Sequence, residues 1–194
     1  MNSTPLLVNI QRDKLPRPTM TTINTYTKYK HQIVEVDFNE FMAARGDLRK
    51  AWHCAGSLFH LHDWVYAGHN ASIDAKYTFV NDKGRKQKVS CATHFANSLG
   101  QAEPKFQLIL GIANASKHLV LYPPPKGRSN PSGMPSNAAN TYVSGRAFQP
   151  NAFQANAFQT GNVKLQRSSG DIEFAVLAQD VLNMWNQLFT TEGW

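Results

Sequence analysis

The stretch DFNEFMAARGDLRKAWHCAGSLFHLHDWVY, residues 37–66, decides the fold of this chain. Its apolar side chains recur at steps of three and four residues, which puts them on one face of an α-helix. Asp37 is a suitable N-cap residue. We therefore predict one long helix whose buried face is formed by Phe38, Phe41, Leu48, Trp52, Ala55, Phe59, His62 and Tyr66. Gly46 and Gly56 lie inside it, and we interpret them as points of close packing or a kink.

Two strand-like runs follow this helix. Residues 75–80 and 85–90 flank Asn81-Asp82-Lys83-Gly84, which has the composition of a tight turn. The pattern predicts a β-hairpin with a basic tip. Tyr142-Val143 and Val163-Lys164-Leu165 are predicted to pair as a second hairpin.

Three further helices are expected. Cys91 to Leu99 forms a short helix that Gly100 ends, and Pro104 opens another that runs to His118. Residues 172–189, with Asp171 as the cap, carry their apolar side chains on one face and form a closing helix. The predicted fold is mainly α: a bundle of about four helices with a long first helix and two small β-hairpins.

Residues 1–34 contain three prolines and a threonine-rich patch without helical periodicity, so we expect an extended N-terminal arm. Residues 35–194 form a single helical domain, because 42% apolar residues are enough to fill one core. Within it, residues 147–162 repeat Ala-Phe-Gln three times without a charge. Phenylalanines five residues apart share no face of a helix or strand, so the repeat is expected to be an exposed loop.

The formal net charge is +7, from 20 basic and 13 acidic residues. This balance favours a polyanion, such as a nucleic acid, or an acidic protein as the partner. There are two cysteines, no secretory leader and no apolar run of the ~20 residues that a bilayer requires. We expect a cytoplasmic protein that has no membrane partner.

The predicted first helix also carries polar residues on one stripe. His53 and His60 are two helical turns apart, on the same side as Arg49, Ser57 and Asp63. Such a stripe can line a pocket with His94 or His118 from neighbouring helices. Because His60, Asp63 and His118 are metal-ligand types, a zinc or iron site is an alternative. The chain has no His-x-x-x-His or Glu-x-x-His pair, so we predict hydrogen-bonded histidines and no metal or cofactor.

Asn114 and His118 are four residues apart, so they lie on one side of the helix that Pro104 opens. An amide in this position can orient the imidazole. Asn-x-x-x-His near the end of an amphipathic helix resembles the HEPN group of helical domains, found in toxins, defence systems and RNA-processing proteins. The resemblance implies RNA cleavage across a dimer interface, with His118 as the catalytic imidazole and Asn114 as its polar companion.

The HEPN arginine has no direct counterpart, because Ala113 precedes Asn114. Arg49, one turn before His53, is the candidate to replace it in space and to stabilise a phosphate transition state. The predicted catalytic set is therefore His118, Asn114 and Arg49.

The tip of the first hairpin carries four bases in six residues, Lys83, Arg85, Lys86 and Lys88, which we predict to contact nucleic-acid phosphates. Tyr77 and Phe79 on the preceding strand can stack on bases if they face outward.

The Ala-Phe-Gln repeat resembles Asn-Ala-Phe-Gln repeats of phage and prophage proteins, some of them structural. Two hypotheses of different classes follow. The first is a HEPN-like, phage- or defence-associated domain that binds nucleic acid or a protein partner. The alternative is a non-enzymatic phage-type structural or interaction protein that uses the N-terminal arm and the phenylalanine repeat for contacts.

Overall fold

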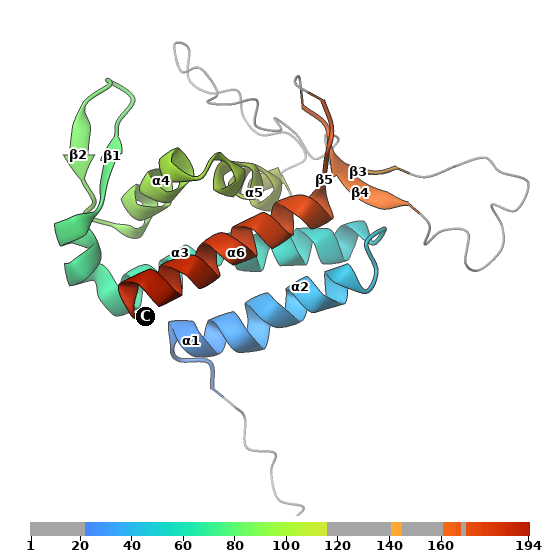
Figure 1. Ribbon diagram of the computed structural model, residues 1–194, viewed down its shortest axis with the longest axis horizontal. Coiled ribbons are helices and arrows are strands. Elements are labelled where there is room, and N and C mark those ends of the chain that lie inside the picture. The colour runs from blue at the N-terminus through green and yellow to red at the C-terminus, as the bar shows by residue number, and fades with distance from the viewer. Residues whose placement is uncertain (1–21, 116–140, 145–160, 168–169) are drawn as a thin grey trace, which may run out of the picture.

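The computed structural model describes residues 22–115, 141–144, 161–167 and 170–194, and its architecture is mainly α (Figure 1). The first helical segment is continuous from Tyr26 to Met42: α1 (Tyr26–Tyr29), a π-helical turn, η1 (Lys30–Val34), and α2 (Glu35–Met42). Thr25 caps it, since its hydroxyl accepts a hydrogen bond from the Lys28 backbone N–H at 3.1 Å. Residues 26–34 are therefore helical, where we had expected an extended arm.

The long helix predicted from residue 37 is two helices. A turn at residues 43–46 separates α2 from α3 (Leu48–Lys76), and Gly46 lies in this turn. Asp47 caps α3 by accepting from the Lys50 N–H at 3.1 Å. The prediction of one helix was wrong because the periodic apolar residues belong to two antiparallel helices that bury their faces against each other (Figure 1).

α3 is the central helix, and α2, α4, α5 and α6 all pack against it. Its buried residues follow the predicted three- and four-residue spacing and include Ala51, Ala55, Leu58 and His62. The helix continues ten residues beyond the predicted end at Tyr66, with a kink at His69, where φ is −136° and ψ is 22°.

α4 (Ala92–Ala102) and α5 (Pro104–Ala115) follow the first hairpin. Gly100 does not end α4 as predicted, because it lies within the helix. A Cβ atom at this position would stand 2.5 Å from the Gln107 side chain, so glycine allows α5 to approach closely. Pro104 opens α5 as predicted.

Two small antiparallel sheets accompany the helices. β1 (Thr78–Val80) pairs with β2 (Lys86–Lys88), which confirms the basic hairpin. β3 (Thr141–Ser144) pairs with β4 (Asn162–Leu165), as predicted, and β4 also pairs with β5 (Ile172–Glu173). The closing helix α6 (Phe174–Glu192) therefore begins two residues later than expected. Residues 147–160 of the repeat lie outside the described residues.

The core is formed where α6 crosses α3. Trp185 is 0% exposed, and its indole Nε1 donates a hydrogen bond to the Leu58 carbonyl at 3.0 Å. Phe106 of α5 packs against the Trp185 ring with centroids 5.9 Å apart. This tryptophan joins three helices.

We expect Trp185→Ala to lower the free energy of unfolding by about 3–5 kcal/mol, because it leaves a large cavity. Trp185→Phe should cost about 1–2 kcal/mol, since it loses the hydrogen bond and part of the ring. Val176→Ala, at a 52% exposed position of the same helix, is the control and should change stability by less than about 0.5 kcal/mol. Urea unfolding followed by circular dichroism measures all three; equal midpoints would contradict the central role of Trp185.

Candidate functional site

The tip of the β1–β2 hairpin is held by one asparagine. The Asn81 carboxamide oxygen accepts hydrogen bonds from the backbone N–H groups of Lys83 and Arg85, each at 3.0 Å. The Gly84 N–H donates to the Asn81 carbonyl, and Gly84 adopts a φ of +72° that side chains disfavour. The tip therefore has a defined shape.

α4 anchors the hairpin to the bundle. The Gln101 carboxamide donates to the Val80 carbonyl and accepts from the Val80 N–H, each at 2.7 Å. The Ser98 hydroxyl donates to the Thr78 carbonyl at 2.8 Å. These bonds occupy the outer edge of β1, so β2 is the strand that faces away from α4.

The four predicted phosphate-binding residues lie together on this hairpin. Lys83, Arg85, Lys86 and Lys88 are all exposed, and none forms an ion pair with a described acidic side chain. Figure 1 shows the hairpin standing out from one end of the helices. An array of unpaired cations on a projecting element is suited to contact a phosphate backbone.

Stacking of bases on Tyr77 and Phe79 is not supported by their orientation. Phe79 is 5% exposed and stacks on the His94 ring at 4.5 Å. The Tyr77 hydroxyl donates to Glu192 Oε1 at 2.9 Å, and Lys76 also pairs with that carboxylate. Burial and this hydrogen bond raise the pKa of Tyr77. Both rings are part of the fold rather than of the exposed surface.

Two histidines of α3, His60 of the polar stripe and His62 of the buried face, form a network around one carboxylate. Asp63 lies 2.9 Å from His60 Nδ1 through one oxygen and 3.2 Å from His62 Nε2 through the other. The hydrogen bonds from His62 and His60 lower the pKa of Asp63 to about 2, against the opposing effect of burial. His62 is 4% exposed, and its Nδ1 lies 2.7 Å from the Phe59 carbonyl. Both ring nitrogens of His62 therefore lie within hydrogen-bonding distance of an oxygen atom.

Two further histidines, His69 and His94, pack against aromatic rings. His69 lies between Tyr26 and Trp194, with ring centroids 4.7 Å and 5.3 Å away. His94 packs on Phe79, and its Nδ1 is 3.1 Å from the Ser90 hydroxyl. His94 thus supports the hairpin and does not join the His60 network. Among the described residues, no group of three or more histidine, cysteine or acidic side chains could hold a metal ion.

The predicted catalytic residues are spread over two helices. Arg49 and His53 are exposed in the first two turns of α3, and Asn114 is half-buried near the end of α5. α5 packs on α3 and runs antiparallel to it (Figure 1). The end of α5 that carries Asn114 therefore lies toward the start of α3. His118 lies outside the described residues.

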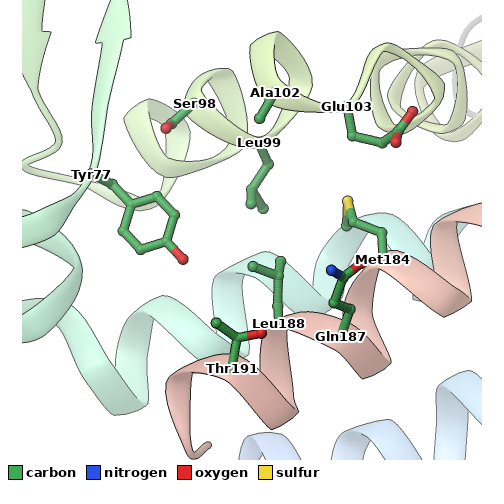
Figure 2. A pocket seen from close by; sticks show the side chains of 9 residues that line it. All are labelled: Tyr77, Ser98, Leu99, Ala102, Glu103, Met184, Gln187, Leu188 and Thr191. Atoms are coloured by element: carbon green, nitrogen blue, oxygen red, sulfur yellow. The ribbon is translucent and has the colours of Figure 1, made fainter.

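A groove of about 350 Å³ runs between α4 and the second half of α6. Figure 2 shows Leu99 and Ala102 of α4 on one side and Met184 and Leu188 of α6 on the other, with Tyr77 at one end. Among the described residues that line it, Glu103 alone is charged, and its carboxylate accepts from the Lys105 N–H and so caps α5. An apolar groove without a basic side chain does not suit a phosphate. The remaining lining residues are Ser98, Gln187 and Thr191.

Sequence reasoning missed the groove and the pairing of His62 with Asp63. The groove residues come from α4, α6 and the residue after α3, and no periodicity within one element relates them. His62 was expected on the apolar face, where it is indeed buried. The signal for its pairing was the adjacent acid, Asp63, which directly follows His62 and comes three residues after His60 in the sequence.

Comparison with protein-family models, curated proteins and solved structures finds no match for this chain. No described helix has the length and apolar character that crossing a membrane requires.

The Asp63 network makes stability depend on pH. The folded pKa of about 2 lies below the ordinary aspartate value of about 3.9, so the carboxylate contributes stability above about pH 4 that is lost as the pH falls through 2. The side chain is 49% exposed, so we expect Asp63→Asn to cost less than about 1 kcal/mol at neutral pH.

The difference in free energy of unfolding between the native protein and Asp63→Asn should shrink toward zero near pH 2. Urea unfolding at several pH values measures this difference. Glu40→Gln, at an exposed position of α2, is the control. A difference that stays constant with pH would contradict the assignment.

Proposed function

We propose that this protein is a nucleic-acid-binding helical domain that contacts phosphates through the β1–β2 hairpin. The observation that carries the proposal is a set of four exposed basic side chains on a hairpin fixed to α4, none of which forms an ion pair with a described residue: Lys83, Arg85, Lys86 and Lys88. Binding through such residues releases counterions from the nucleic acid, which supplies affinity without a specific sequence.

The overall charge supports the same partner. The chain carries +7, so long-range attraction favours approach of a polyanion. An acidic protein would experience the same attraction, but it lacks the regular spacing of phosphates along a nucleic acid. The salt dependence of binding to nucleic acid therefore tests the proposal directly.

We expect Lys86→Gln combined with Lys88→Gln to weaken binding to a labelled nucleic acid at least about tenfold at low salt. The slope of log affinity against log salt should fall by about 1.8, or 0.9 for each lost phosphate contact. Fluorescence anisotropy at several salt concentrations measures both quantities.

The matched control removes two lysines elsewhere, with Lys28→Gln combined with Lys50→Gln. These residues lie in α1 and the first turn of α3. If both double variants lose the same affinity, net charge and not the hairpin governs binding, and the proposal fails.

A second function, cleavage of RNA, is favoured by one observation. α5, which carries Asn114, packs on α3, which carries Arg49. In this proposal His118 transfers the proton, Asn114 orients the imidazole and Arg49 stabilises the charge that develops on phosphorus.

The test is an RNA-degradation assay. We expect His118→Ala to lower the cleavage rate about 10²- to 10⁴-fold, as for loss of a general acid–base group, and Arg49→Ala to lower it about 10²- to 10³-fold. His31→Ala removes an exposed imidazole from η1 and should have no effect. If the native protein and His118→Ala are equally inactive, the nuclease hypothesis is wrong, and the hypothesis of a non-enzymatic interaction protein is favoured.

A further inference from the structure

The hairpin has two different faces. Thr78 is opposite Lys88 and Val80 is opposite Lys86, and since side chains alternate along a strand these four share one face. All four are exposed, Val80 to 48%. The opposite face carries Phe79, which is buried against His94 of α4. The lysine-bearing face is therefore the outward face of the hairpin.

Among the described residues, no aromatic ring belongs to this outward face. Phe79 is stacked beneath the hairpin, and the Tyr77 ring packs edge-on against Phe95 with centroids 5.3 Å apart. The outward residues of β1 and β2 are two lysines, a threonine and a valine. Among the described residues, this face offers cations and small side chains.

This composition distinguishes between two kinds of nucleic acid. Proteins that bind single strands combine a basic groove with aromatic rings on which the bases stack, and each stacked base contributes about 1–3 kcal/mol. Duplexes have stacked, paired bases and are bound through their phosphates, which stand in a regular array. A surface with cations and no free ring matches the duplex.

The backbone that carries the cations is also held in place before binding. Gln101 and Ser98 fix β1 to α4, and Asn81 fixes the tip. Lys86 and Lys88 stand two strand residues apart, about 6.6 Å. A preorganised array loses little entropy on binding a rigid target, whereas a flexible single strand must itself be ordered.

We propose that the outward face of the β1–β2 hairpin recognises double-stranded nucleic acid through its phosphates, without base stacking. This inference rests on the proposed nucleic-acid-binding function and names its substrate class. The ribbon of two strands fits the major groove of B-form DNA, which admits such an element, whereas the major groove of A-form RNA is deep and narrow. In both duplexes the phosphates along the groove edge provide the partners for the lysines.

The test compares the affinities of four nucleic-acid probes for the full chain. Fluorescence anisotropy is measured with a labelled DNA duplex of about 20 base pairs, or two helical turns, the RNA duplex of the same sequence, and one single strand of each. We expect at least one duplex to bind about tenfold or more tightly than its own single strand. Tighter binding of the DNA duplex identifies the major groove as the site, and tighter binding of the RNA duplex identifies its phosphate edge.

Two variants refine the comparison. Lys86→Gln combined with Lys88→Gln should abolish the duplex preference, and Phe79→Leu, which keeps an apolar side chain beneath the hairpin, should leave duplex affinity within about twofold of native. Circular dichroism checks that both remain folded.

If single strands bind as tightly as the duplexes, the inferred preference for double strands is wrong, while the proposed binding of nucleic acid is still supported. Absence of binding to all four probes would overturn the proposed function and this inference with it.

Discussion

The packing of Trp185 against α3 is the interaction on which the rest of the structure depends. The indole is fully buried, and its hydrogen bond to the Leu58 carbonyl fixes α6 to the centre of the long helix. α5 packs on the same ring through Phe106, and α4 packs on the same helix. Because α4 also holds the hairpin, the position of the basic residues is determined through a continuous series of packed elements that begins at this tryptophan.

The structure separates residues that maintain the fold from residues available for binding. His62, His69 and His94 are packed against other rings, and Tyr77 and Phe79 are turned toward the bundle. The basic residues of the hairpin make no comparable contacts with described residues. Conspicuous aromatic and histidine content therefore reflects mostly stability here, whereas the proposed function depends on ordinary lysines and an arginine.

Much of the fold was predictable because it follows from local patterns. Residues Asn81 to Gly84 have the composition of a tight turn, which predicts the first hairpin. Short runs that contain β-branched residues predict the β3–β4 pair. The break between α2 and α3 could not be predicted, because Ala43 and Ala44 favour a continuous helix. The change of chain direction between the two helices depends on the Asp47 cap and on packing. Ile172 and Glu173 likewise continue the helical pattern of α6, but pairing with β4 draws them into a strand.

For the site, the basic tip was predictable from composition, whereas the inward orientation of Phe79 was not. That orientation depends on His94, 15 residues later in the chain, and sequence periodicity does not reveal which face of a short hairpin a helix covers. The antiparallel packing of α3 and α5 is likewise a tertiary property.

The Gln101 side chain has one more consequence. By bonding both backbone groups of Val80 it occupies the edge of β1 as a neighbouring strand would, which leaves β2 as the free edge of the hairpin. An unprotected edge invites pairing with another chain and aggregation, and charged side chains, lysine above all, are the usual protection. Lys86 and Lys88 stand on that edge. The same two charges that we propose as phosphate contacts thus also protect this edge against pairing with another copy of the protein.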